Sequence, residues 1–157
     1  MKARDALIRN MKEAISNALE TMFFLPVQFP DTECTLQTWF PDKRSLIGAT
    51  LKFHGPWSGS FFIFIPVKVV NEITANFLGL REEEITEEQE KDTVKEAINI
   101  IGGHMFSFFD KEGEFRLGIP ELLKERDVTD DKLENINGDF ILVETENNHL
   151  AVGIVQD

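Results

Sequence analysis

The first 25 residues carry apolar side chains at intervals of three and four positions, the spacing of one face of an amphipathic helix. The residues at these positions are Leu7, Ile8, Met11, Ile15, Leu19, Met22 and Phe23. Pro26 interrupts the pattern, because proline has no amide hydrogen to donate inside a helix. We therefore predict a long amphipathic helix that ends before Pro26.

The part of the chain that follows has the apolar pattern of β-strands. The segment 35–40 alternates weakly between apolar and polar residues and predicts a short strand. Residues 45–66 predict two strands joined by a turn at Gly55 and Pro56. The second of these strands is apolar almost throughout, which indicates burial on both of its faces.

Two further helices are predicted in the middle of the chain. The first covers residues 67–79 and is closed by Gly79, because glycine readily takes the left-handed conformation of a C-cap. The second follows an acidic stretch, and Thr86 and Gln89 near its start have the spacing of a capping box. Its apolar stripe consists of Val94, Ala97, Ile98, Ile101, Met105 and Phe108. A stripe of this width is suited to packing on a sheet.

The remaining segments predict extended structure. Residues 114–122 contain Pro120, which cannot donate to a central ladder, so we expect them at a sheet edge. Residues 138–155 predict a hairpin around Asn147 and Asn148. The order helix, strands, helix, helix, strands predicts an α+β fold, an antiparallel sheet with long helices packed on one face. Since no repeat or linker interrupts the 157 residues, we expect a single domain over positions 1–157.

Composition and charge narrow the classes of function. Twenty-eight acidic and 16 basic residues give a net charge of −12, which repels a phosphate backbone and argues against a nucleic-acid partner. No segment approaches the ~18 apolar residues of a membrane span, and the first residues lack the apolar stretch of a signal peptide. The single cysteine, Cys34, excludes an internal disulfide and a multi-cysteine metal site. We expect a cytoplasmic protein without a membrane segment.

The long helix around residue 99 contains three poor helix formers in a short stretch. Asn99 costs a helix several tenths of a kcal/mol relative to alanine, and Gly102 and Gly103 cost about 1 kcal/mol each. At ~100° per residue, Asp92, Glu96, Asn99 and Gly103 fall within roughly 60° of one another, opposite the apolar stripe. Glycine on such a face allows the backbone of another molecule to come close. This face is the candidate functional site.

Spacing alone also allows a second interpretation, that these are ordinary polar residues of a solvent-exposed face. Asp130, Glu134 and Asn137 repeat the same offsets elsewhere in the chain. That second copy has no apolar stripe beside it and ends in the dipeptide Asn137-Gly138, which favours a turn. Context therefore has to decide between the two interpretations.

Other residues with catalytic potential lack the partners that catalysis needs. His54, His104 and His149 lie on different predicted elements, and no two of them have the spacing of metal ligands. Ser107 is not flanked by a nucleophile motif. We expect these side chains to have packing or surface roles.

The stretch Asp92-x3-Glu96-x2-Asn99, followed by Ile100 and Gly102, resembles the D/S-x3-E-x2-N motif of the CheC/CheX/FliY family of chemotaxis phosphatases. The resemblance extends over nearly the whole chain in the order of its predicted elements and in the stretches "FLG" and "LGIPEL". The chain length and the single convincing copy of the motif are closer to CheX than to the two-motif CheC and FliY. The resemblance implies a CheX-like α+β domain that pairs edge to edge with a second copy as a homodimer.

The resemblance also implies an activity in two-component signalling, hydrolysis of the phospho-aspartate of a CheY-like response regulator. Glu96 would pair with the active-site lysine of the phosphorylated regulator and Asn99 would hold the attacking water, while Asp92, Gly102 and Gly103 would contact this partner. A divalent metal is expected on the regulator, so the chain needs no cofactor. A carboxylate next to a phosphoryl group is repelled unless it binds a cation, which favours Glu96 as a docking ion pair over Glu96 as a general base.

An alternative function remains on the same fold, a non-catalytic module that docks response regulators or flagellar switch proteins. Asn99 is the residue that separates the two, because a pure docking surface does not need a water-positioning amide at that place.

Overall fold

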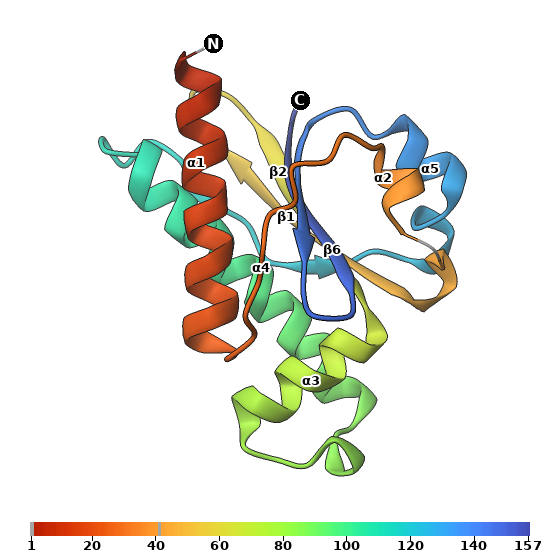
Figure 1. Ribbon diagram of the computed structural model, residues 1–157. Helices are drawn as coiled ribbons and strands as arrows, with labels where there is room; N and C mark the ends of the chain where they lie inside the picture. Colours follow the sequence, from red (N-terminus) through yellow and green to blue (C-terminus); the bar gives the residue numbers. More distant parts are fainter. Residues whose placement is uncertain (1, 41) are drawn as a thin grey trace.

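The fold is organised around a six-stranded antiparallel sheet, in a computed structural model that describes residues 2–40 and 42–157 (Figure 1). The strand order is β3-β1-β2-β6-β5, and β4 pairs with β1 beside β3. The strands are β1 (Leu46–His54), β2 (Gly59–Pro66), β3 (Arg116–Leu117), β4 (Glu121–Leu122), β5 (Asp139–Glu144) and β6 (His149–Gln156). The predicted strand pair, the edge segment and the C-terminal hairpin are confirmed.

Strand β2 lies in the middle of the sheet, with one face buried and the other buried at Phe64 and partly buried elsewhere. This agrees closely with its apolar sequence. In the register of the sheet, Ile63 lies between Ala49 of β1 and Val152 of β6. Ile63 belongs to the main core, whereas its neighbour Phe64 packs in a smaller core on the opposite face. The alternation of a β-strand thus feeds two cores from one segment.

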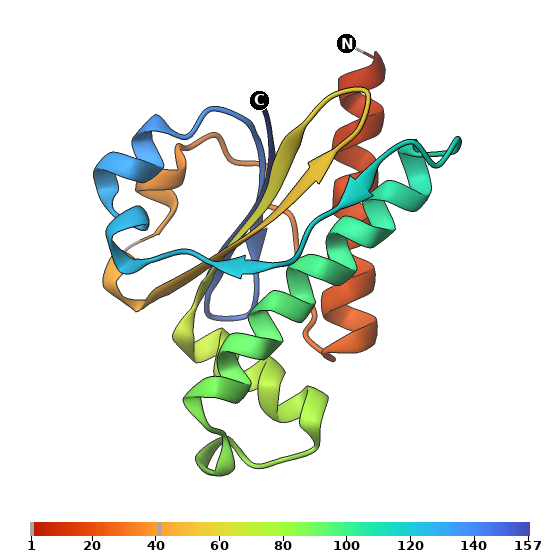
Figure 2. The same ribbon diagram turned by 180° about the vertical axis from the view of Figure 1, so that it is seen from behind.

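The long helices lie together on one face of the sheet, which confirms the predicted α+β class (Figures 1 and 2). They are α1 (Lys2–Ser16), its π-helical continuation η1 (Asn17–Met22), α3 (Val67–Leu78) and α4 (Glu87–Phe109). The C-cap of α3 is Gly79 with φ 68°, a left-handed conformation that suits glycine. Helix α4 packs on β1 and β2 and contacts both α1 and α3. None of the helices in residues 2–40 and 42–157 has the length and apolar character needed to span a membrane.

The opposite face of the sheet is partly covered by two short helices that the apolar pattern does not predict. Segment 35–40 forms helix α2 (Leu36–Trp39), so the predicted strand there is wrong. The cause is local, because the Thr35 hydroxyl accepts the amide of Thr38 and fixes a helical turn. The indole of Trp39 then donates to the carbonyl of Leu150 at 2.7 Å and fastens α2 to the sheet.

The second copy of the spacing motif begins in the other short helix, α5 (Asp130–Asn135), rather than in a turn as expected. Helix α5 packs against α2, and Leu133 contributes to the smaller core. The remaining short elements are the 3-10 turns η2 (Lys43–Ser45), η3 (Glu82–Glu84) and η4 (Glu125–Asp127).

Candidate functional site

Helix α4 carries the candidate site, and its start is firmly capped. The Thr86 hydroxyl accepts the amide of Gln89 at 3.1 Å, and the Gln89 side chain accepts the amide of Thr86 at 3.0 Å. This reciprocal pair is the predicted capping box. One turn further on, Lys91 and Glu87 form an i,i+4 ion pair at 3.5 Å. The helix is therefore held as a regular scaffold from its first turn.

The buried face of α4 follows the predicted stripe except at its C-terminal end. Residues Val94, Ala97, Ile98, Ile101 and Met105 are all buried. Phe108 was expected in this stripe but is 41% exposed, and Phe106 is buried in its place. The reason is tertiary, since the chain after α4 folds back and brings the Phe115 ring to 5.5 Å from that of Phe106. Phe53 closes the same aromatic cluster at 5.5 Å from Phe106.

The opposite face of α4 presents the three polar residues of the motif to solvent. Asp92, Glu96 and Asn99 are all exposed. Within residues 2–40 and 42–157, the side-chain hydrogen bonds and ion pairs of α4 are made by other residues, at the cap, at Lys91 with Glu87, and at buried or C-terminal positions. The carboxylates and the amide are therefore available to another molecule.

The two glycines of this helix have different surroundings. A Cβ on Gly103 would have no atom within 4 Å, so its surface lies open beside the exposed motif residues. A Cβ on Gly102 would lie 2.7 Å from the Leu51 methyl and 3.2 Å from the Phe61 ring. Gly102 is buried and lets α4 approach the sheet, so its predicted place in the partner-binding surface is wrong. Gly103 follows Asn99 by one helical turn, and its part in partner binding stays a prediction.

The candidate site is a convex helix face and not a cleft. The hollow next to it has a volume of about 430 Å³ and is lined by Glu87, Glu88, Lys91, Asp92 and Lys95. Carboxylates and ammonium groups alternate there, which suits contacts with a charged protein surface. On the flank of the helix, partial burial and then the charge of Glu87 raise the pKa of Glu90. Within the described residues, no group of three or more His, Cys, Asp or Glu side chains could hold a metal ion.

The second copy of the motif does not form an equivalent face. Glu134 lies on α5, but that helix ends at Asn135 and Asn137 follows it in irregular backbone. Ile136, the C-cap, is extended at ψ 124°, so the helical phase between Glu134 and Asn137 is lost. Of the two copies, only the one on α4 places its three residues on one helix face.

The other polar candidates are engaged in structural contacts. His104 Nδ1 lies 3.3 Å from the Asn17 amide nitrogen, which links α4 to η1. His149 stacks on Trp39 with ring centroids 4.0 Å apart. Ser107 donates to the carbonyl of His104 at 2.7 Å. These contacts account for the side chains without a catalytic role.

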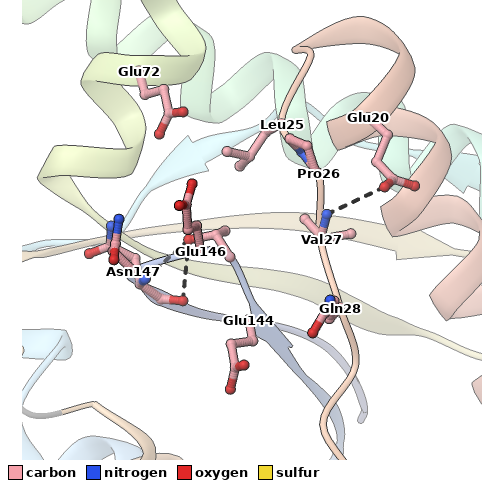
Figure 3. Close-up of a pocket in the computed structure, with 11 residues that line it drawn as sticks. Glu20, Leu25, Pro26, Val27, Gln28, Glu72, Glu144, Glu146 and Asn147 are labelled. Carbon is pink, nitrogen blue, oxygen red and sulfur yellow. Dashed lines mark hydrogen bonds between the residues drawn. The ribbon is translucent and has the colours of Figure 1, made fainter.

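One feature of the surface is not indicated by any sequence pattern. The acidic pocket, as we call it, has a volume of about 550 Å³ and is bordered by Glu20, Glu72, Glu144 and Glu146 (Figure 3). These four residues come from η1, α3 and the β5–β6 hairpin, so only the tertiary fold brings them together. No run of adjacent acidic residues in the sequence could have located it.

The antiparallel sheet with long helices on one face is the fold of solved CheX, CheC-like and FliY proteins. The family model described as chemotaxis phosphatase CheX matches residues 47–141. The chain belongs to this CheX family, as the resemblance of its motif predicts. The match begins within β1, ends within β5 and includes the whole of α4. No curated protein is significantly similar in sequence.

Solved structures of related proteins share the fold at low sequence identity. CheX from Vibrio vulnificus is 18% identical, with a TM-score of 0.72 over 96% of both chains. CheX in a CheX-CheY-BeF3-Mg complex from Borrelia burgdorferi is 17% identical, with a TM-score of 0.67 over 95% of this chain and 96% of that one. FliY from Thermotoga maritima is 17% identical, with a TM-score of 0.54 over 91% and 84%.

Proposed function

We propose that this CheX-family protein hydrolyses the phospho-aspartate of a CheY-like response regulator, using the exposed face of α4 that contains Asp92, Glu96, Asn99 and Gly103. The observation that carries the proposal is the placement of the three polar motif residues, exposed on one side of a regular helix whose other side is buried. A regular helix fixes the relative positions of side chains separated by three and four residues, which is what an in-line hydrolysis requires.

Asn99 supplies the positioning of the water. Its amide can donate a hydrogen bond and accept one, so it can both hold a water molecule and orient its lone pair towards phosphorus. Phosphoryl transfer depends mainly on positioning and on stabilisation of charge, so no nucleophile from this chain is needed. The open surface at Gly103, one turn further along the helix, leaves room for the regulator backbone close to the water.

Glu96 is the docking residue in this proposal. A carboxylate brought next to a phosphoryl group is repelled, so it needs a cationic partner in the complex. The lysine of a regulator active site provides that cation, and the resulting ion pair fixes the register of α4 over the phosphorylation site. Asp92, one turn earlier, extends the same acidic contact.

The convex shape of the site supports a reaction completed by the partner protein. A helix face cannot enclose a small phosphorylated substrate, but it can be inserted over the shallow site of another protein. A structural relative occurs in a complex with CheY, BeF3 and Mg²⁺. In the proposed reaction the divalent ion belongs to the regulator, and this chain contributes the amide and the carboxylate.

We also propose that the protein is a homodimer. The sheet edge at β3 and β4 has two strands of only two residues each, and Ile119 between them is 83% exposed. An incompletely paired, apolar edge of this kind favours pairing with a second edge.

The activity is tested by the release of inorganic phosphate from CheY-like regulators charged with acetyl phosphate and Mg²⁺. We expect release to be faster with the protein than without it, and to depend on protein concentration at fixed regulator concentration. Unchanged release together with binding that is sensitive to Glu96→Ala would identify α4 as a docking surface without catalysis, the alternative function.

A further inference from the structure

A second surface of the molecule combines exposed apolar side chains with the acidic pocket. Met22, Phe24, Phe77 and Leu78 are 42%, 67%, 41% and 41% exposed. The first two lie at the end of η1 and the other two at the end of α3. Exposed large apolar residues scattered singly need no explanation, but a contiguous group is typical of an interaction surface. We call these four residues the apolar patch.

Two contacts bring the halves of the apolar patch together. The ring of Phe23, which is fully buried, packs against Phe77 with ring centroids 5.1 Å apart. The side-chain amide of Asn76 donates to the carbonyl of Phe23 at 2.9 Å. Since Phe23 is flanked by Met22 and Phe24, these contacts place the segment that carries both residues against the end of α3. Figures 1 and 2 show the lower end of the N-terminal helix beside α3.

The backbone at Phe24 is held in an unusual conformation. Its φ is 54°, in the left-handed region that a bulky residue rarely adopts. The amide of the next residue, Leu25, donates to the carbonyl of Leu19 at 2.8 Å and closes the end of η1. Phe24 is the most exposed side chain of the apolar patch. Strain that persists around an exposed aromatic ring is typical of functional positions.

The acidic pocket continues from the same segment of chain. Glu20 precedes the apolar patch on η1 and accepts the amide of Val27 at 3.4 Å, while Glu72 comes from α3 (Figure 3). The hairpin residues Glu144 and Glu146 border the other side. Among the residues that the structure describes, no lysine, arginine or histidine lines the pocket. The surface therefore joins a hydrophobic part to a part with uncompensated negative charge.

We propose that the apolar patch and the acidic pocket together form a docking site for a protein segment that carries both basic and large apolar side chains. Aromatic residues and methionine are enriched in protein interfaces, and the carboxylates complement a lysine- or arginine-bearing partner. A second copy of this chain would bring its own glutamates against the same four, which disfavours self-association here. Anionic membranes and nucleic acids are repelled in the same way.

This docking site is separate from the candidate phosphatase site. None of the residues that form the apolar patch or line the acidic pocket belongs to α4. The inference therefore goes beyond the proposed phosphatase activity and stands or falls independently of it. A partner at this surface would leave the exposed face of α4 free.

The test uses three fluorescein-labelled helical peptides and fluorescence anisotropy with the full-length chain. The first peptide repeats Lys-Leu-Leu-Lys, the second repeats Glu-Leu-Leu-Glu, and the third repeats Lys-Ser-Ser-Lys. We expect saturable binding of the first peptide only, because the site requires positive charge and apolar side chains together. Spermine is added as a small competing cation and should not displace the peptide at equal charge concentration.

Two variants remove the two parts of the site, and a third is the matched control. Phe24→Asn removes the aromatic ring and keeps a residue that tolerates the left-handed conformation. The double change Glu72→Gln and Glu146→Gln removes two pocket charges. Glu112→Gln with Glu114→Gln removes the same charge from exposed residues in the turn after α4. We expect the first two to weaken peptide binding by about tenfold or more, and the control to leave it unchanged.

Several results would overturn the proposal. One is the absence of saturable binding of the Lys-Leu-Leu-Lys peptide to the parental protein. Another is equal affinity of the Phe24→Asn and parental proteins for this peptide, which would mean that the peptide binds through general charge attraction alone. Displacement by spermine would identify the pocket as a small-cation site, and a dimer that dissociates in Phe24→Asn would assign the surface to self-association. Thermal melts of all variants establish that each remains folded.

Discussion

At the scale of single residues, the adjacent glycines of α4 show that the same residue type can serve two purposes within one helical turn. Gly102 permits close packing on Leu51 and Phe61, and Gly103 leaves the exposed face uncovered. The helical phase predicts that Gly103 lies on the open side of the helix. It does not predict the burial of Gly102, which lies at the border between the apolar and the polar face of the helix. Whether a residue at such a border is buried depends on how closely the neighbouring sheet packs there.

The two glycines can be separated by alanine substitutions. Gly102→Ala should destabilise the protein by about 1–3 kcal/mol, because the new methyl group collides with the Leu51 side chain. Gly103→Ala should stabilise it by about 0.4–1 kcal/mol, since alanine is the better helix former and the site is open. Chemical denaturation of both variants measures these changes. Equal effects of the same sign would contradict the assigned surroundings.

Glu96 is the residue for which the proposal predicts a change in binding. Glu96→Ala should weaken association with the phosphorylated regulator, and Glu96→Lys should weaken it further, because two ammonium groups would then face each other. The parental affinity should also fall with added salt, which screens exposed charges beyond ~8 Å at physiological ionic strength. Titration calorimetry at two salt concentrations measures both effects. The ion pair would be excluded if the affinity changed neither with the Glu96 substitutions nor with the salt concentration.

At the scale of elements, the patterns that involve many residues predict the structure best. Apolar periodicity and the glycine, proline and cap signals predict the N-terminal helix, the β1–β2 pair, α3, α4 and the β5–β6 hairpin. The N-terminal helix is described from Lys2 to Met22. Helix α2 was missed because four residues are too few to show a helical period. Phe106 is buried in place of Phe108 because it packs against Phe115. Phe115 lies after the end of the helix, so the periodicity of the helix could not predict this contact.

Helix α4 should also show a pH-dependent contribution from Glu90. Burial raises the pKa of this carboxyl above its value in the unfolded chain, so its ionisation on the folded protein is unfavourable. The protonated form of Glu90 therefore favours the folded state. This contribution to stability is fully present below the unfolded pKa of 4.5, and it is lost as the pH rises through the pKa of Glu90 in the folded protein. Glu90→Gln should raise the melting temperature slightly at pH 7 and leave it unchanged at pH 3.5. Glu88→Gln, an exposed position on the same turn, is the control and should give no gain at pH 7.

At the scale of the whole molecule, the family, the α+β class and the position of the motif follow from the sequence, whereas the surfaces do not. The residues of the acidic pocket are separated by up to 126 positions, from Glu20 to Glu146, and only the packing of η1, α3 and the hairpin assembles them. The motif on α4 could be located because all of its residues belong to one helix. The same spacing at Glu134 and Asn137 has no functional geometry, since the helix ends between them.

The proposed homodimer belongs to this scale. Sedimentation equilibrium at micromolar concentration should give twice the mass of the 18.0 kDa chain. Ile119→Asp should shift the equilibrium towards the monomer, because it places a charge on the exposed residue between β3 and β4. A parental protein that remains monomeric well above micromolar concentration would contradict the dimer.

The central claim is that Asn99 positions the attacking water, and one measurement tests it most directly. Phosphate release from a phosphorylated CheY-like regulator is compared for the parental protein, Asn99→Ala and Asn137→Ala, with regulator binding measured in parallel. We predict that Asn99→Ala leaves binding nearly intact and removes about 2 to 4 kcal/mol of transition-state stabilisation, while Asn137→Ala behaves as the parental protein. Hydrolysis at the parental rate by Asn99→Ala, or its loss in Asn137→Ala, would contradict the claim.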